Sequence, residues 1–257
     1  MTTTSISVCI PARNEAATVG ELVRAVRRHP LVLDEGEVLV LDHASTDDTA
    51  ANATAAGATV FSANDVLADF GPALGKGDVL WRSVHVAQGE VIVWLDADLR
   101  SYSDAYITNL VLPFDNDDAI TMVRPDYPRT LDGRPDGGGR ITESIAKPLL
   151  RSHYPQLSHI RQPLAGEYAI RRSAARVLPF EVDYGVEIGL LIDIADRFGI
   201  DSIAQVDLPA RVHRNRPESE LVEPGRQVAR TILSRIGLDE QRTRPPLAAF
   251  LVSTSGN

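Results

Sequence analysis

The sequence predicts an α/β fold in which a mostly parallel sheet carries helices on both faces. Over the first 120 residues, short apolar segments rich in β-branched residues alternate with segments whose apolar residues recur at helical spacing. This alternation is typical of parallel sheets, because parallel strands need a crossover between them, usually a helix. A hydrophobic content of 44% in 257 residues is enough for one sizeable core, so disorder is not expected.

The first half is predicted to contain four strands separated by three helices. Ser5 begins a short β-branched strand, and Val19, Leu22 and Val26 follow it at helical spacing. Ser45 is the expected N-cap of the second helix. In chain order, the expected elements are strand 5–10, helix 16–29, strand 37–41, helix 46–56, strand 59–62, helix 75–87 and strand 91–95.

The pattern changes after about residue 113. Residues 126–140 are rich in Pro, Gly and Asp and are expected to form a loop. Because no internal repeat or low-complexity tract is present, we expect a single domain over 1–257, with a tail over 241–257. The expected elements of this half are helix 140–152, an apolar helix over 185–198, strand 203–212 and helix 223–236.

Charge and composition exclude several classes of protein. The formal net charge of -9 disfavours nucleic acid and anionic membranes as partners. The single cysteine, Cys9, is expected to be buried in the first strand and forms no internal disulfide. No apolar run approaches the roughly 20 residues that span a bilayer, and residues 1–5 lack the features of a signal peptide. We therefore expect a cytoplasmic protein without membrane insertion.

Acidic residues stand where the fourth strand ends, in Trp94-Leu95-Asp96-Ala97-Asp98. Two carboxylates one residue apart suit a hard divalent cation, although such a pair alone often only caps a turn. The first strand runs into Pro11-Ala12-Arg13-Asn14-Glu15 and the second into Asp42-His43-Ala44-Ser45. The carboxyl ends of parallel strands share one edge, where ligands bind, so these groups are expected to converge. Asp47 and Asp48 are interpreted as structural.

These motifs, with Gly75-Lys76-Gly77, resemble in order and spacing the GT-A glycosyltransferases, whose fold is Rossmann-like. The second half looks like the glucosyl-3-phosphoglycerate synthases, and the resemblance runs from about residue 6 to about residue 237. The segments that carry it are Gly137-Gly138-Gly139-Arg140-Ile141-Thr142-Glu143, Gln162-Pro163-Leu164-Ala165-Gly166-Glu167-Tyr168, Tyr184-Gly185-Val186-Glu187 and Arg211-Val212-His213-Arg214-Asn215. The resemblance implies that roughly 1–120 bind a nucleotide-sugar donor and roughly 121–240 bind the acceptor.

The resemblance also implies a role for individual residues. Asp98 and His213 are expected to hold Mg²⁺ or Mn²⁺, and Glu187, Lys76 and Asp98 to take part in catalysis. Glycine N–H groups before a helix suit a phosphate, and the acceptor 3-phosphoglycerate is expected at Gly139, Arg140, Thr142 and Asn215. The expected donor-binding residues are Pro11, Ala12, Arg13, Glu15, His43, Lys76, Asp96, Ala97 and Asp98.

The expected reaction is transfer of glucose, with retention, from a nucleotide diphosphate glucose to the 2-hydroxyl of 3-phosphoglycerate. UDP-glucose is the first choice of donor, although His43 replaces a residue that is commonly small in the family and leaves UDP and GDP both open. The segment 124–136 also looks divergent and lies near the expected acceptor entrance. The resemblance further suggests a homodimer.

Other interpretations stay open. The same scaffold could use GDP-glucose, a mannose donor or another small anionic acceptor. A nucleotidyltransferase shares the topology, but it normally carries a Gly-rich basic signature after the first strand. Pro11-Ala12-Arg13 does not match that signature. A non-catalytic nucleotide-sugar-binding protein is the most distant alternative, and the presence of Lys76, Asp98 and His213 argues against it.

Overall fold

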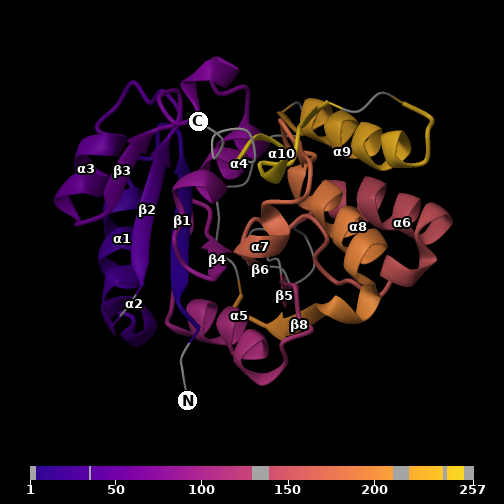
Figure 1. Cartoon of the computed structure of the whole chain (residues 1–257), viewed down its shortest axis with the longest axis horizontal. Helices are drawn as coiled ribbons and strands as arrows, with labels where there is room; N and C mark the ends of the chain where they lie inside the picture. Colours follow the sequence, from indigo (N-terminus) through magenta and orange to yellow (C-terminus); the bar gives the residue numbers. More distant parts are fainter. Residues whose placement is uncertain (1–3, 35, 129–138, 211–219, 240–241, 252–257) are drawn as a thin grey trace.

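The computed structural model describes residues 4–34, 36–128, 139–210, 220–239 and 242–251. A seven-stranded sheet with the order β3-β2-β1-β4-β6-β5-β8 forms its centre (Figure 1). Only β6 runs against its neighbours β4 and β5, so the sheet is mostly parallel, as predicted. The strands are β1 (Ile6–Ala12), β2 (Glu37–Asp42), β3 (Thr59–Ser62), β4 (Val91–Trp94), β5 (Met122–Asp126), β6 (Tyr168–Arg171) and β8 (Ile203–Asp207).

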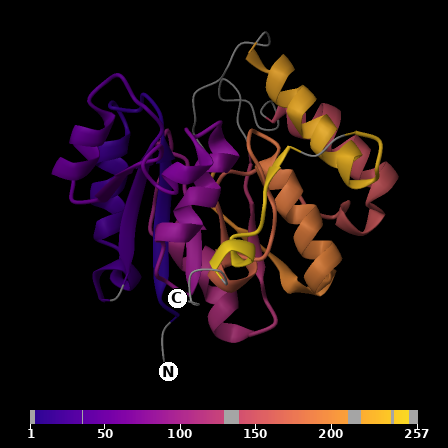
Figure 2. The same cartoon turned by 45° about the horizontal axis from the view of Figure 1, so that its top comes forward.

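Helices cover both faces of the sheet (Figures 1 and 2). On one face α1 (Val19–Arg27), α3 (Thr49–Ala55) and α5 (Ala105–Asn116) pack against Val8, Ile10 and their neighbours. On the other face α4 (Lys76–Val86), α6 (Lys147–His153), α8 (Val186–Phe198) and α9 (Val222–Arg235) pack against Cys9, Trp94 and their neighbours. The alternation of side chains along each strand therefore divides the core into two halves. Short helices complete the fold: α2 (Pro30–Asp34), α7 (Arg172–Ala175) and α10 (Ala248–Leu251).

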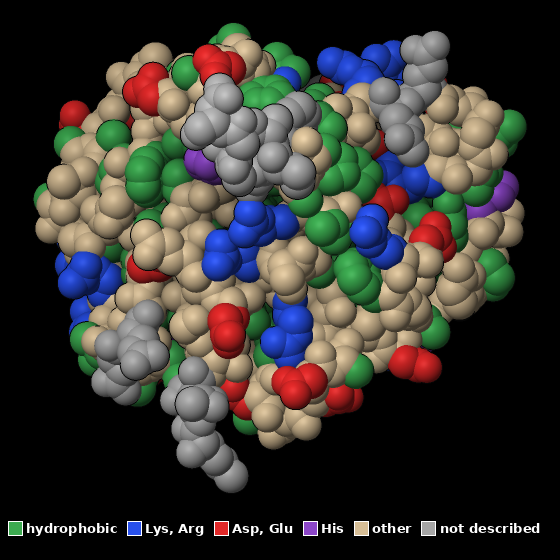
Figure 3. All heavy atoms as spheres, in the orientation of Figure 1, with side chains coloured by type: hydrophobic (Ala, Val, Ile, Leu, Met, Phe, Trp, Pro, Cys, Tyr) green, Lys and Arg blue, Asp and Glu red, His purple; other side chains and the backbone are tan. Residues whose placement is uncertain are grey.

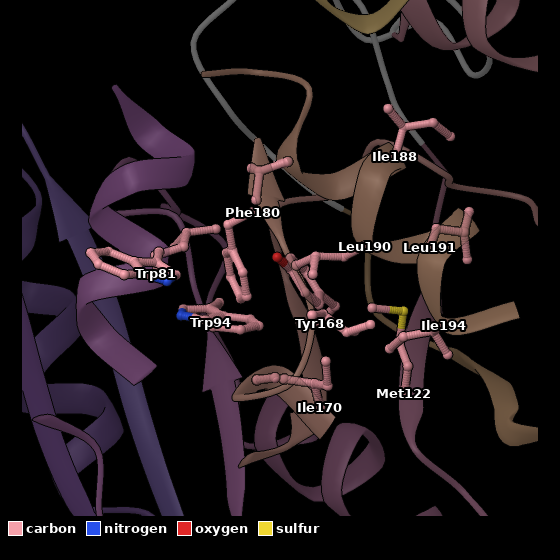
Figure 4. Packing of buried hydrophobic residues seen from close by; sticks show 14 of the residues in the cluster. Trp81, Trp94, Met122, Tyr168, Ile170, Phe180, Ile188, Leu190, Leu191 and Ile194 are labelled. Atoms are coloured by element: carbon pink, nitrogen blue, oxygen red, sulfur yellow. The ribbon is translucent and has the colours of Figure 1, made fainter. Parts of the chain in front are cut away.

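Aromatic side chains from distant parts of the chain join the second face of the core (Figure 4). The ring of Trp94 lies 4.9 Å from the ring of Tyr168 and 6.2 Å from that of Phe180. Phe180 belongs to β7 (Phe180–Glu181), which pairs with β9 (Thr243–Arg244) in a separate two-stranded sheet. This packing places the first turn of α4 and the start of α8 at the same edge of the main sheet.

Most predicted elements are present, but their boundaries differ. Helix α1 begins at Val19 rather than Ala16, and α3 begins at Thr49 rather than Thr46. The prediction that Ser45 caps α3 is wrong, because its hydroxyl accepts the N–H of Asn14 at 2.9 Å. The predicted helix 140–152 divides into a π-type turn η2 (Thr142–Ala146) and α6.

Two further boundaries were misjudged near the end of the chain. Strand β8 ends at Asp207, before the predicted end of the strand 203–212, and residues 211–219 lie outside the described residues. Part of the segment that the sequence assigned to a tail forms β9 and α10.

The predicted burial of the single cysteine is confirmed. Cys9 is fully buried and unpaired, and burial raises the pKa of its thiol. Among the described helices, none combines the length and apolarity needed to cross a membrane. On the face shown in Figure 3, Lys and Arg side chains form small groups separated by acidic and apolar side chains, rather than one continuous basic surface.

Candidate functional site

A cavity of about 380 Å³ lies at the carboxyl ends of β1, β2 and β4. All nine residues predicted to bind the donor line it, so the predicted convergence of the strand ends is found. The remaining wall comes from the start of α4, from the turn between β7 and α8, and from α9. The lining residues are Pro11, Ala12, Arg13, Glu15, His43, Leu74, Gly75, Lys76, Val79, Asp96, Ala97, Asp98, Asp183, Tyr184 and Gln227.

Reciprocal hydrogen bonds hold the loops after β1 and β2 together. Asn14, which has a φ of 55°, donates its N–H to Ser45 Oγ at 2.9 Å and accepts the N–H of Thr46 at 2.8 Å. Asp47 accepts the hydroxyl of Thr49 and the N–H groups of Thr49 and Ala16, and these bonds, the hydroxyl bond foremost, lower the pKa of its carboxyl. These bonds give Asp47 a structural role, and they join the two loops that carry Arg13, Glu15 and His43 of the cavity wall.

Lys76 connects two carboxylates at the floor of the cavity. Its Nζ lies 2.7 Å from Asp96 Oδ1, at the end of β4, and 2.7 Å from Glu187 Oε1, in the first turn of α8. Burial alone would lower the pKa of Lys76, but the two negative charges outweigh burial and hold this pKa well above its ordinary value. Lys76 is therefore protonated at neutral pH, and its ammonium is held between two carboxylates whose combined negative charge exceeds its own.

Glu187 lies behind Lys76 rather than on the cavity wall. Only 4% of this residue is exposed, and it is not among the residues that line the cavity. The structure thus brings the three predicted catalytic residues to one region but gives them different access. Lys76 and Asp98 face the cavity, whereas Glu187 is reached through Lys76.

The described residues offer a small set of oxygen ligands for a metal ion. No group of three His, Cys, Asp or Glu side chains in the described part of the chain could hold a metal ion alone. Asp98 lines the cavity and Asp96 is paired with Lys76. Mg²⁺ usually takes one or two carboxylates and completes its shell with water and substrate phosphates, so this set fits a metal bound together with a diphosphate. His213, the other predicted ligand, lies outside the described residues.

The predicted acceptor residues that the structure describes are not part of the cavity wall. Gly139 has a φ of 75° and Thr142 is 2% exposed at the start of the η2 turn, while Arg140 is half-buried between them. None of these three lines the donor cavity. Helix α9 connects the two regions, because Gly225 packs against Ile145 of η2 and Gln227 lines the cavity. Asn215 lies outside the described residues.

Part of the cavity wall was not predicted from the sequence. Asp183 accepts the N–H of Gly185 at 3.0 Å and forms an ion pair with Arg230 of α9 at 2.5 Å. The Tyr184 N–H donates to Gln227 Oε1 at 3.3 Å. The two contacts with α9 join segments more than 40 residues apart, so no local pattern marks Asp183 or Gln227 as a cavity residue.

Comparison with known proteins agrees with this geometry. The family described as glycosyl transferase family 2 matches residues 7–175. The glucosyl-3-phosphoglycerate synthase of Mycolicibacterium smegmatis is 45% identical over 243 residues, which are 92% of this chain and 79% of that protein. The protein of the same name from Petrotoga mobilis is 40% identical over 240 residues, which are 90% of this chain and 73% of that protein.

A solved structure matches as well. The glucosyl-3-phosphoglycerate synthase of Mycobacterium tuberculosis, in complex with Mn²⁺, UDP and glucosyl-3-phosphoglycerate, superposes with a TM-score of 0.87 at 40% identity, over 96% of this chain and 91% of that one. The chain belongs to the glucosyl-3-phosphoglycerate synthase family. It is a GT-A-type glycosyltransferase, as predicted, and a nucleotidyltransferase does not fit this family.

The close packing of α4 on β7 gives a stability prediction. A Cβ on Gly77, the second residue of α4, would lie 1.8 Å from the carbonyl oxygen of Glu181. We expect Gly77→Ala to lower the free energy of unfolding by about 1–3 kcal/mol, because backbone must move to make room. Urea denaturation measures the change.

Gly20 provides a matched control. It is the second residue of α1, and a Cβ there would meet its nearest neighbour at 3.4 Å, which is ordinary contact. Gly20→Ala is expected to leave the free energy of unfolding unchanged or to raise it by up to about 1 kcal/mol. A Gly77→Ala protein as stable as wild type would contradict the packing described for α4.

Proposed function

We propose that this protein transfers glucose from UDP-glucose to the 2-hydroxyl of 3-phosphoglycerate, with retention at the anomeric carbon. The observation that carries the proposal is the cavity that combines the Lys76 ammonium with the Asp98 carboxylate at the sheet edge. A cation and a metal-binding carboxylate side by side suit a nucleotide diphosphate whose leaving oxygen gains negative charge. The M. tuberculosis relative was solved with UDP-glucose, phosphoglyceric acid and Mn²⁺, which supports the same donor, acceptor and metal here.

The proposed roles of the residues combine the geometry of the cavity with the family resemblance. Lys76 would bind the donor diphosphate, and Glu187 would hold Lys76 in its orientation from behind. Asp98, with His213, would hold Mg²⁺ or Mn²⁺, which when bound neutralises charge on the departing diphosphate. Arg140 with Gly139, Thr142 and Asn215 would bind the acceptor phosphate.

A front-face transfer fits the burial of Glu187. The acceptor oxygen bonds to the anomeric carbon while the bond from that carbon to the diphosphate oxygen breaks, and the hydroxyl proton leaves with the diphosphate. Glu187 is paired with Lys76 and does not line the cavity, so we do not assign it the part of a covalent nucleophile. A homodimer and a cytoplasmic location stay predictions from the family resemblance and the composition.

His43 is proposed to recognise the nucleobase. Its Nε2 lies 3.0 Å from the carbonyl oxygen of Ala73, which can only accept, so Nε2 carries the proton in the neutral ring and Nδ1 is an acceptor. Uracil and guanine present an imino N–H that such an acceptor can bind, whereas adenine and cytosine present an acceptor at the equivalent ring nitrogen. The site therefore favours uracil or guanine donors, and the M. tuberculosis complexes favour uracil.

The activity itself is tested with purified protein, a panel of UDP- and GDP-sugars, and the acceptors 3-phosphoglycerate, glycerate and simple sugar phosphates. We expect mass spectrometry to detect glucosyl-3-phosphoglycerate from UDP-glucose, and EDTA to abolish it because the diphosphate loses its neutralising cation. Added Mn²⁺ should restore the product. Donor binding without turnover for every acceptor would instead indicate a non-catalytic binding protein, and turnover with a different sugar or acceptor would correct the assignment.

The assignment of His43 is tested by His43→Ser. We expect its kcat/KM with UDP-glucose to fall about 10-fold, because a hydrogen bond that discriminates between bases is lost, and its preference for UDP-glucose over ADP-glucose to shrink by a similar factor. His85→Ser is the control, since His85 is exposed on α4. A His43→Ser enzyme with the wild-type preference would contradict base recognition by this ring.

A further inference from the structure

The end of the described chain packs against elements that carry the wall of the donor site. Strand β9 pairs antiparallel with β7, and the N–H of Val182 donates to the carbonyl oxygen of Arg242 at 3.1 Å. Beyond the strand, the carbonyl oxygen of Pro245 accepts the indole N–H of Trp81 at 3.0 Å, and Leu247 is buried in the core. Residues 242–247 therefore contact both α4 and β7.

Arg244 makes the strongest of these contacts, with Asp78 in the first turn of α4. Its Nε and Nη2 lie 3.0 and 2.8 Å from the two carboxylate oxygens of Asp78, which is 0% exposed. The guanidinium carbon also lies 5.6 Å from the ring centroid of Trp81 and 5.9 Å from that of Phe70. A planar, two-bonded pairing of this kind fixes orientation as well as distance.

Asp78 in turn fixes the segment that carries Lys76. One of its oxygens accepts the N–H of Leu74 at 2.9 Å, and its own N–H donates to the carbonyl oxygen of Val182 at 3.1 Å. Leu74 and Lys76 both line the donor cavity. Burial alone would raise the pKa of Asp78, but the bonds from Arg244 and Leu74 and the charges of Arg82 and Arg244 outweigh burial and lower it, so the carboxylate is ionised.

The pairing matters because Lys76 and Glu187 come from elements that the main sheet does not join. Lys76 is the first residue of α4. Glu187 lies in α8, which follows β7 and the turn at Asp183 and Tyr184 in the chain. The backbone of Arg244 pairs with β7, and its side chain pairs with Asp78 of α4. Arg244 therefore connects the two elements that position Lys76 and Glu187.

We propose that Arg244 is a positioning residue that holds Lys76 against Glu187, and that the segment 242–247 is thereby part of the donor site. The proposal rests on the proposed function only in taking Lys76 to bind the donor diphosphate. Arg244 does not line the cavity and so does not contact the donor itself. Its effect should pass through Lys76 and disappear when Lys76 is removed.

A double-mutant cycle tests this, with calorimetric binding of UDP in the presence of Mn²⁺ as the readout. We expect Arg244→Met to weaken UDP binding about 10-fold in the wild-type background and less than about 2-fold in the Lys76→Met background, because coupled residues are not additive. Arg244→Lys keeps the charge but loses the two-bonded geometry, and it should weaken binding by an intermediate factor. Arg197→Met is the control, since Arg197 bonds the carbonyl oxygen of Val177 at the far end of α8.

The outcomes separate the possible explanations. Wild-type UDP affinity in Arg244→Met would overturn the proposal, and so would an equal loss with and without Lys76, because that result would describe a general structural effect. If Arg244→Met fails to fold, the same comparison with Arg244→Lys decides the question. A wild-type protein that binds UDP but forms no glucosyl-3-phosphoglycerate would overturn only the proposed function, and one that binds no UDP would overturn both.

Discussion

The contact of Lys76 with Asp96 and Glu187 is the interaction on which the donor site depends. Asp96 follows β4, Lys76 begins α4 and Glu187 lies in α8. The two 2.7 Å distances therefore require these three elements to keep fixed positions relative to one another. The contact also decides the charge of the cavity floor, because two carboxylates keep one lysine protonated despite its burial. The ammonium is therefore oriented before a ligand binds, which avoids the cost of ordering a long side chain during binding.

Buried ion pairs around the β7–α8 turn support this contact. Arg235 of α9 binds Glu181 at 2.7 Å and Asp193 at 2.8 Å, with only 4% of its side chain exposed, and Arg230 binds Asp183. Such pairs contribute little net stability compared with apolar packing, but removing one partner leaves a buried charge and is costly. Their value in this fold is geometric, because they dock α9 on the turn that carries the cavity wall.

The part of the site that could be predicted from sequence is the part that local pattern determines. The residues that follow β1 and β4 include Arg13 and Asp98, which were predicted because apolar strands followed by polar residues mark the ligand edge of a parallel sheet. Tertiary contacts decided the rest. Ser45 was misassigned as a helix cap because its hydroxyl accepts a hydrogen bond from the backbone N–H of Asn14, which is 31 residues away in the chain. Three strands are too short to show a periodic pattern of their own. They are β6, which has four residues and runs antiparallel between β4 and β5, and the two-residue strands β7 and β9.

The most direct measurement of the central claim is the affinity for UDP, by calorimetry with Mn²⁺, of Lys76→Met compared with Lys147→Met. Lys147 is the other lysine of the chain and pairs with Glu143 at 2.5 Å, outside the donor cavity. Loss of a hydrogen bond between charged groups predicts at least about 10-fold weaker binding for Lys76→Met and wild-type binding for Lys147→Met. Equal UDP affinity in Lys76→Met and wild type would contradict the role given to this cation.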